Sequence, residues 1–116
     1  MGEITPVEYW VESLRGREVV ISGDFRTDLQ MTKRDMRERA IGAGAARASE
    51  DVRRTTDIFV KGHSPLYKFD EHGDKEAELA ARAPRALVID GWGFRALLEG
   101  RRAPAWRPMQ PPRTAM

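Results

Sequence analysis

The apolar residues of this chain gather in short runs that separate longer, charge-rich segments. Three of these runs, VVI, IFV and LVI, are unbroken and rich in β-branched side chains, which is typical of strands that are buried on both faces. A shorter run that contains alanine lies between the first two. We therefore expect four strands, over residues 17–22, 45–48, 57–62 and 85–89.

Helical patterns occupy the segments around these strands. Thr5 with Glu8, and Thr32 with Asp35, have the spacing of a capping box, in which two side chains satisfy free backbone groups at the start of a helix. Asp90 is a single cap for the last helix. We expect helices over residues 5–15, 32–44, 74–82 and 91–99. The segment that follows the first strand, "DFRTDLQM", is expected to form a loop.

The order of the elements predicts the fold class. Strands that alternate with helices form a mainly parallel sheet with helices on both faces, so we expect an α/β fold. We divide the chain into an N-terminal helix (residues 1–15), one α/β domain (16–100) and a basic, proline-rich, flexible tail (101–116). The N-terminal helix is expected to pack on the domain through one apolar face: Val7, Trp10, Val11 and Leu14.

Composition narrows the class of protein. The chain has 116 residues, enough for one domain, and its lack of cysteine excludes disulfides and thiolate metal sites. No apolar run approaches the roughly 18 residues that a membrane span needs, so we expect a soluble cytoplasmic protein. The net charge is only +2, but 16 of the 20 basic residues are arginine. Arginine suits phosphate, because its planar fork donates two hydrogen bonds at once.

Several motifs of enzymes and metal sites are incomplete. The stretch GAGAAR lacks the third glycine of a dinucleotide fingerprint, and it ends a helix where such a fingerprint opens one. His63 and His72 lie near three acidic residues, but the spacing matches no known metal loop. Ser22 lacks the Gly-x-Ser-x-Gly context of a hydrolase nucleophile. We therefore expect no catalytic residue, no metal, no cofactor and no enzymatic activity.

Parts of an anion-binding pocket remain. In an open parallel sheet, ligands bind beyond the carboxyl ends of the strands, and Ser22 and Gly23 lie at such an end. Lys33 and Arg34 begin the first helix of the domain, near the same end. Residues 73–75, Gly-Asp-Lys, are expected to open the second helix, whose N–H groups and dipole favour an anion. The sequence therefore predicts a phosphate-sized pocket at this edge.

Five stretches follow the pattern of one family. GREVVISGDF resembles its first strand, which ends in Thr/Ser-Gly, and TKRDMRERAIGAGA resembles its first helix and glycine turn. RRTTDIFVKG resembles the basic pair, Thr-Asp and third strand. GDKEAEL resembles the lysine-bearing second helix, and LVIDGWGFRALLEG the last strand and helix. Over about residues 16–100 the chain thus resembles a BRCT domain, closest to the single BRCT modules of bacterial NAD-dependent DNA ligases and of the clamp-loader large subunit.

The resemblance implies a four-stranded parallel sheet of order 2-1-3-4, with two helices on one face and one on the other. It also implies a set of phosphate-binding residues, because phosphate-binding BRCT domains use the corresponding positions. Lys68 is a rival for the phosphate lysine, since the loop that contains it is longer than usual. The carried-over positions are Ser22, Gly23, Lys33 or Arg34, Gly73 and Lys75.

The leading expectation is a non-catalytic DNA-binding module that holds the 5′-phosphate of a duplex end or nick, in DNA repair or replication. One alternative is a protein–protein interaction module that binds a repair or replication protein, with or without phosphopeptide recognition. Another is a domain of a larger DNA ligase-like enzyme. In the leading case we expect contacts to the duplex from peripheral arginines: Arg26, Arg37, Arg53 and Arg54, together with Arg34.

Overall fold

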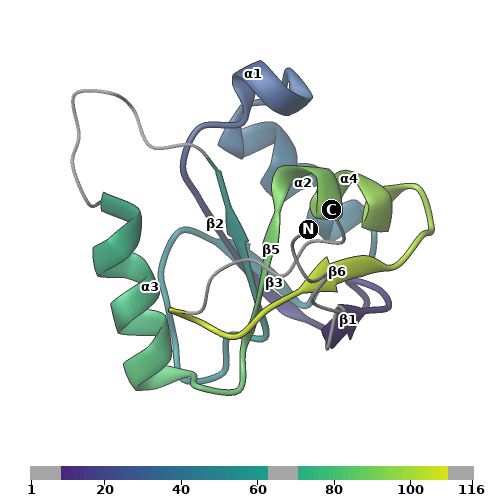
Figure 1. Ribbon diagram of the computed structural model, residues 1–116. Coiled ribbons are helices and arrows are strands. Elements are labelled where there is room, and N and C mark those ends of the chain that lie inside the picture. Colours follow the sequence, from purple (N-terminus) through teal and green to yellow (C-terminus); the bar gives the residue numbers. More distant parts are fainter. Residues whose placement is uncertain (1–8, 63–70, 110–116) are drawn as a thin grey trace, which may run out of the picture.

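The sheet has four parallel strands: β2 (Glu18–Ser22), β3 (Arg47–Ser49), β4 (Ile58–Lys61) and β5 (Leu87–Asp90). Their order is β3-β2-β4-β5, which is the 2-1-3-4 order that the resemblance implied. The computed structural model describes residues 9–62 and 71–109, without the side chains of residue 28 and residues 71–74. The α/β class and the parallel sheet are confirmed (Figure 1).

The helices differ from the prediction in two places. α2 (Lys33–Gly42) begins at the predicted capping box, with both of its hydrogen bonds formed, and α4 (Gly91–Leu98) begins after the predicted Asp90 cap. α1 (Arg26–Leu29) is a single short turn within the segment expected to be a loop. α3 (Glu71–Arg82) begins three residues before Asp74, so the prediction that residues 73–75 open it is wrong.

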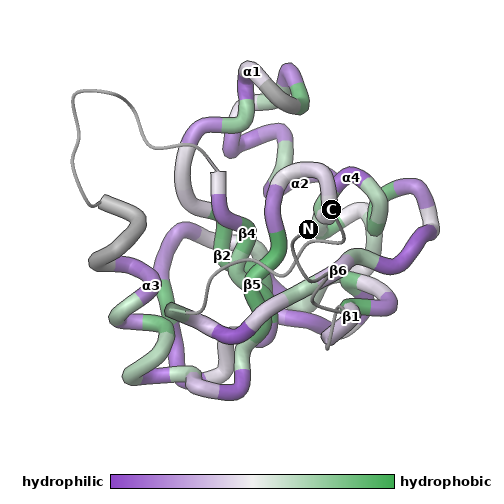
Figure 2. Tube along the Cα trace, viewed as in Figure 1, coloured by the Kyte–Doolittle hydropathy of each residue, from purple (hydrophilic) through white to green (hydrophobic). Residues whose placement is uncertain are grey.

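Alternate side chains of each strand point to opposite faces of the sheet, and each face has its own core. Ile21, Val60 and Ile89 pack with α2 and α4 in one core, whereas Phe59 and Val88 pack with α3 in the other. Two helices therefore cover one face and one helix covers the other. Hydrophobic residues follow the central strands, and hydrophilic residues lie mostly outside them (Figure 2).

A small second sheet joins the two ends of the described chain. β1 (Tyr9–Val11) pairs antiparallel with β6 (Ala103–Ala105), and Val11 lies opposite Ala103. The expected helix over residues 5–15 is therefore wrong from residue 9 onward, and residues 1–8 lie outside the described chain. Leu14 is buried as expected, but Trp10 is 37% exposed and stacks under Arg102.

The expected flexible tail is also wrong as far as residue 109. Trp106 is buried, and its backbone exchanges two hydrogen bonds with Val88, of 2.7 and 3.0 Å. This bridge covers the outer edge of β5, which would otherwise expose unpaired backbone groups. The packed unit therefore spans residues 9–109, apart from the undescribed segment 63–70, and the domain boundaries at 16 and 100 were drawn too narrowly. Within this unit no helix is long and apolar enough to cross a membrane.

Candidate anion-binding site

The predicted Ser-Gly pair lies where β2 ends. Ser22 is buried, it lies opposite Lys61 in the register, and its carbonyl accepts a 2.8 Å hydrogen bond from the Gly62 N–H. Gly23 has φ +106°, a conformation that side-chain-bearing residues rarely adopt. The glycine therefore allows the chain to turn sharply at the carboxyl edge of the sheet.

Gly62 serves a different purpose, which is close packing. A Cβ atom at this position would lie 2.8 Å from the Phe25 ring and 2.9 Å from the Asp24 carbonyl oxygen. The backbone of Gly62, which follows β4, thus packs directly against the Phe25 ring, which follows β2. This close contact leaves no room for a side chain at position 62. This packing gives the edge near Ser22 a fixed shape.

Three cations meet at Glu50, the residue that follows β3. The Lys33 Nζ lies 2.7 Å from the Glu50 Oε1, and the Arg37 Nη1 lies 3.7 Å from the same oxygen. The Lys75 Nζ donates a 2.5 Å hydrogen bond to the Glu50 backbone carbonyl. We call Lys33, Arg37 and Lys75 the basic cluster. Lys33 and Arg37 come from α2 and Lys75 from α3, so the cluster joins helices from both faces of the sheet.

The three neighbouring cations favour the ionised form of the Glu50 carboxyl group. The hydrogen bond from Lys33, aided by the charges of Lys33, Arg37 and Lys75, lowers the pKa of the Glu50 carboxyl group despite its partial burial. Glu50 is therefore ionised at neutral pH and neutralises one of three positive charges. The cluster keeps a net positive charge that an anion can use.

Glu50, which holds the cluster, follows β3, and Ser22 ends the neighbouring strand β2. Val20 of β2 is opposite Ser49 of β3, so Ser22 and Glu50 follow paired residues at the same edge of the sheet. Adjacent strands are about 4.8 Å apart. The structure therefore brings Ser22, Gly23, Lys33 and Lys75 to one edge of the sheet.

Other predicted residues fall elsewhere. Of the two alternatives Lys33 and Arg34, only Lys33 joins the cluster; the Arg34 side chain is 82% exposed and pairs with Glu38. Arg37 was expected at the periphery but lies in the cluster. Gly73 and Lys75 are the third and fifth residues of α3 and do not open it, and Lys68 lies outside the described residues.

The remaining peripheral arginines do not share one surface. Arg26 pairs with Asp24 at 2.9 Å, next to Gly23 at the carboxyl edge. Arg53 lies 3.8 Å from the side chain of Glu18, the first residue of β2, so Arg53 and its neighbour Arg54 lie at the amino end of the sheet. The sequence could have indicated this separation, because both arginines directly precede the strand expected over residues 57–62, and residues that lead into a parallel strand lie at the amino end of the sheet.

Two charged residues that sequence reasoning missed organise this edge. One is Glu50, and the other is Glu76, whose nearly buried side chain binds Lys61 at 2.7 Å and accepts the Met109 N–H at 2.9 Å. Lys61 lies in the same row as Ser22 but is thereby committed to a structural ion pair. The helical spacing places Glu76 on the same face of α3 as the apolar Leu79. A carboxylate on a buried helix face needs a partner, and this is the signal that could have identified Glu76.

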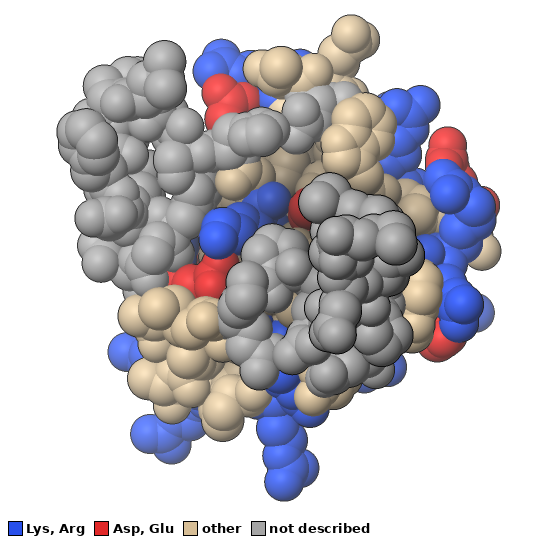
Figure 3. All heavy atoms as spheres, in the orientation of Figure 1, with Lys and Arg blue, Asp and Glu red and all other residues tan. Residues whose placement is uncertain are grey.

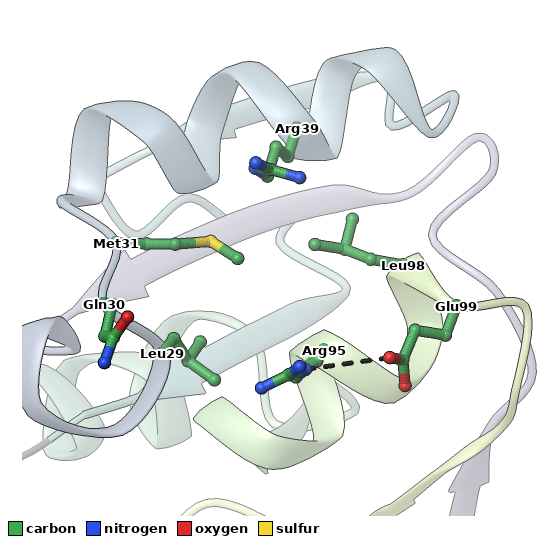
Figure 4. A pocket seen from close by; sticks show the side chains of 7 residues that line it. All are labelled: Leu29, Gln30, Met31, Arg39, Arg95, Leu98 and Glu99. Carbon is green, nitrogen blue, oxygen red and sulfur yellow. Dashed lines mark ion pairs between the residues drawn. The ribbon is translucent and has the colours of Figure 1, made fainter.

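A groove on the face of the domain that α2 and α4 cover is a second candidate site. It has a volume of about 470 Å³ and lies between α1, α2 and α4, where Leu29, Met31 and Leu98 provide an apolar lining. Arg39 and Arg95 project toward it from α2 and α4, and Arg95 pairs with Glu99 (Figure 4). The groove suits a ligand that combines an apolar group with a negative charge.

Comparisons of the chain with family models, with curated proteins and with solved structures find no match. Among the described side chains, no group of three or more histidine, cysteine, aspartate and glutamate residues could hold a metal ion. The side chains of His63 and His72 lie outside that set.

Proposed function

We propose that this protein is a non-catalytic, phosphate-recognising DNA-binding module of the BRCT type, which holds the 5′-phosphate of a duplex end or nick. The observation that carries the proposal is the convergence of Lys33, Arg37 and Lys75 beside Glu50. A phosphate monoester carries about −1.5 to −2 charges at pH 7, which complements three cations beside a single neutralising carboxylate, that of Glu50. A cytoplasmic role in DNA repair or replication belongs to the same proposal.

Each residue at the edge has a distinct role in this binding mode. The Ser22 hydroxyl and the Gly23 N–H are donors for phosphate oxygens, and the glycine leaves the backbone open to close approach. Lys33 and Lys75 supply charge from opposite sides of the phosphate. Arg37 supplies a planar fork that matches two oxygens.

The BRCT assignment is supported by the fold rather than by any match. The strand order β3-β2-β4-β5 and the distribution of helices, two on one face and one on the other, agree with the resemblance. A fold alone does not specify a function, so the phosphate site must carry that part of the proposal.

Glu50 is a built-in competitor in this proposal. Its carboxylate forms an ion pair with Lys33 where a phosphate would bind. The side chains of Glu50 and Lys33 are both about half exposed. Exposed pairs of this kind contribute only about 0–1 kcal/mol, whereas hydrogen bonds to charged groups contribute about 1.5–3 kcal/mol. A bound phosphate should therefore displace the Glu50 side chain from Lys33.

Single substitutions at the edge test the proposal. Ser22→Ala and Lys75→Ala should each weaken binding to a 5′-phosphorylated duplex by roughly tenfold or more, at 1.4 kcal/mol per decade. Arg34→Ala is the matched control, because Arg34 follows Lys33 on the same helix but points to solvent. Fluorescence anisotropy with the phosphorylated and unphosphorylated forms of one duplex measures both effects.

The pattern across the two duplexes decides the outcome. The Ser22 and Lys75 variants should bind the unphosphorylated duplex like the parent, provided that each melts as the parent does. Equal losses on both duplexes would assign these residues to general charge attraction and contradict a 5′-phosphate site.

The groove favours a second candidate function, a protein–protein interaction module. Its occupant would be an acidic segment of a repair or replication protein with an apolar anchor, complementary to Leu29, Leu98 and the two arginines. A peptide pool rich in glutamate and leucine should then bind the parent but not an Arg39→Glu variant. A role as one domain of a larger DNA ligase-like enzyme is compatible with either function.

A further inference from the structure

A hollow of about 330 Å³ lies at the amino end of the sheet, opposite the basic cluster. It is formed by the turn that leads into β4 and by the segment that joins α3 to β5. Its lining includes the side chains of Arg54, Thr55, Arg82 and Arg85. We call it the amino-end hollow. None of these residues belongs to the site described above.

Hydrogen bonds hold the walls of the hollow in place. The Thr56 Oγ1 accepts the Arg53 N–H at 2.9 Å, and the Thr56 N–H binds the Arg53 carbonyl, which closes the turn before β4. The Leu87 N–H then binds the Asp57 carbonyl at 3.0 Å and fixes the second wall against the first. The arginines therefore project from a rigid frame, which is a condition for selective binding.

The hollow has a net positive charge. Within the described chain, neither Arg54 nor Arg85 makes an ion pair or a side-chain hydrogen bond, and Arg82 has only an exposed partner, Glu78, at 3.3 Å. The carboxylate that lines the hollow, Asp57, already accepts the Glu18 N–H at 2.9 Å. Three guanidinium groups therefore face one carboxylate in the lining, which leaves the hollow with a net positive charge.

A fourth guanidinium adds to this field. The Arg107 Nη1 donates a 2.6 Å hydrogen bond to the Arg85 carbonyl, which places its charge beside the hollow. Basic side chains project along the lower edge of the molecule, where α3 ends (Figure 3). Like charges gathered on one surface repel each other, and an anion that bridges them removes this cost.

We propose that the amino-end hollow is a second anion-binding site, which takes phosphodiester groups of a nucleic-acid backbone. Guanidinium groups bind phosphate oxygens in a two-pronged geometry, and the Thr55 hydroxyl is an additional donor. The choice of nucleic acid as the polyanion rests on the proposed function. The site itself rests only on the arginines and the shape of the hollow.

The two sites have a spacing that one nucleic acid can bridge. They lie at opposite ends of strands of about four residues, which corresponds to about 13 Å at 3.3 Å per residue. Along one strand of a duplex, phosphates recur about every 3.4 Å of the helix axis, so this distance spans about four phosphates. A backbone that passes the sheet from end to end can therefore contact both sites.

A pair of charge-neutralising substitutions tests the hollow. In Arg54→Gln/Arg85→Gln, binding to a duplex with 5′-hydroxyl ends should weaken about tenfold. The slope of log K against log salt should fall by about 1.8, since each lost phosphate contact contributes about 0.9. The control is Arg101→Gln/Arg102→Gln, which removes the same charge from two exposed residues in the segment that follows α4. The control should retain most of the affinity.

Each alternative outcome is informative. Equal losses in the two double variants would show that only net charge matters and would overturn the proposal. Polyglutamate that competes as well as the duplex at equal charge would overturn it too, by assigning the hollow to an acidic protein. If a 5′-phosphate makes no difference to the parent while Arg54→Gln/Arg85→Gln still weakens duplex binding, the proposed function fails and the hollow stands.

Discussion

Lys33 on α2 and Glu50 after β3 form an ion pair of 2.7 Å at the carboxyl edge of the sheet. The same glutamate binds Lys75 of α3 through its backbone carbonyl, so one residue holds helices from both faces of the sheet. Its carboxylate therefore has two effects: it steadies the basic cluster, and it competes with any anion for Lys33. These two effects can be separated by substitution.

Replacing Glu50 with glutamine should strengthen phosphate binding. The substitution keeps the backbone carbonyl that binds Lys75 but removes the charge that neutralises Lys33. Because exposed ion pairs are worth at most about 1 kcal/mol, we expect a gain of up to about fivefold with a 5′-phosphorylated duplex. Anisotropy titration measures it. Weaker binding in Glu50→Gln would show that the carboxylate positions Lys33 instead of competing for it.

The lowered pKa of Glu50 predicts how stability depends on pH. A carboxyl group whose folded pKa lies below its unfolded value stabilises the fold above that unfolded value, and the contribution disappears as pH falls through the folded pKa. The ordinary pKa of this group is 4.5. The melting temperature of the parent should exceed that of Glu50→Gln at neutral pH, and the difference should shrink below about pH 4.5. A constant difference across this range would contradict the ion pair.

The core beneath α4 provides a stability prediction. Phe94 is fully buried between α4 and the sheet, so Phe94→Ala should cost about 3–5 kcal/mol of unfolding free energy. Trp92, two residues earlier, is 56% exposed, and Trp92→Ala should change stability by only about 0.5 kcal/mol. Urea denaturation of both variants measures the contrast. Similar losses in the two would mean that the orientation of α4 is wrong.

The segment after β6 gives a prediction that contradicts a flexible tail. Trp106 is buried against Val88 and α3, so Trp106→Ala should also cost about 3–5 kcal/mol of unfolding free energy in urea denaturation. Arg102→Ala, a few residues earlier, removes only an exposed cation–π contact with Trp10, worth about 0.5–1 kcal/mol. If Trp106→Ala is as stable as the parent, the segment after β6 does not contribute to the core, and the original prediction of a flexible tail holds.

The sheet could be predicted from the sequence because its signal is local. The run of Val19, Val20 and Ile21 sends alternate side chains into two different cores, and only a strand covered on both faces tolerates such a run. The first residues of α2 and α4 could be predicted equally well. Thr32, Asp35 and Asp90 cap these helices through hydrogen bonds that span only three residues.

The missed features depend on distant partners. Tyr9 pairs with Ala105, which lies near the other end of the described chain, and the helical spacing of nearby apolar residues concealed that strand. Glu50 was missed because its role comes from Lys33 and Lys75, on elements that precede and follow it. The separation of Arg53 from the carboxyl edge is different, because it follows from the position of Arg53 just before β4 and could have been predicted.

We propose that the carboxyl edge recognises a terminal phosphate. The most direct measurement is the affinity of the parent protein for one duplex with and without a 5′-phosphate, at two salt concentrations. We expect tighter binding of the phosphorylated duplex by roughly tenfold or more, with the preference retained at the higher salt concentration, because charge-assisted hydrogen bonds produce it. Equal affinities for the two duplexes would contradict it.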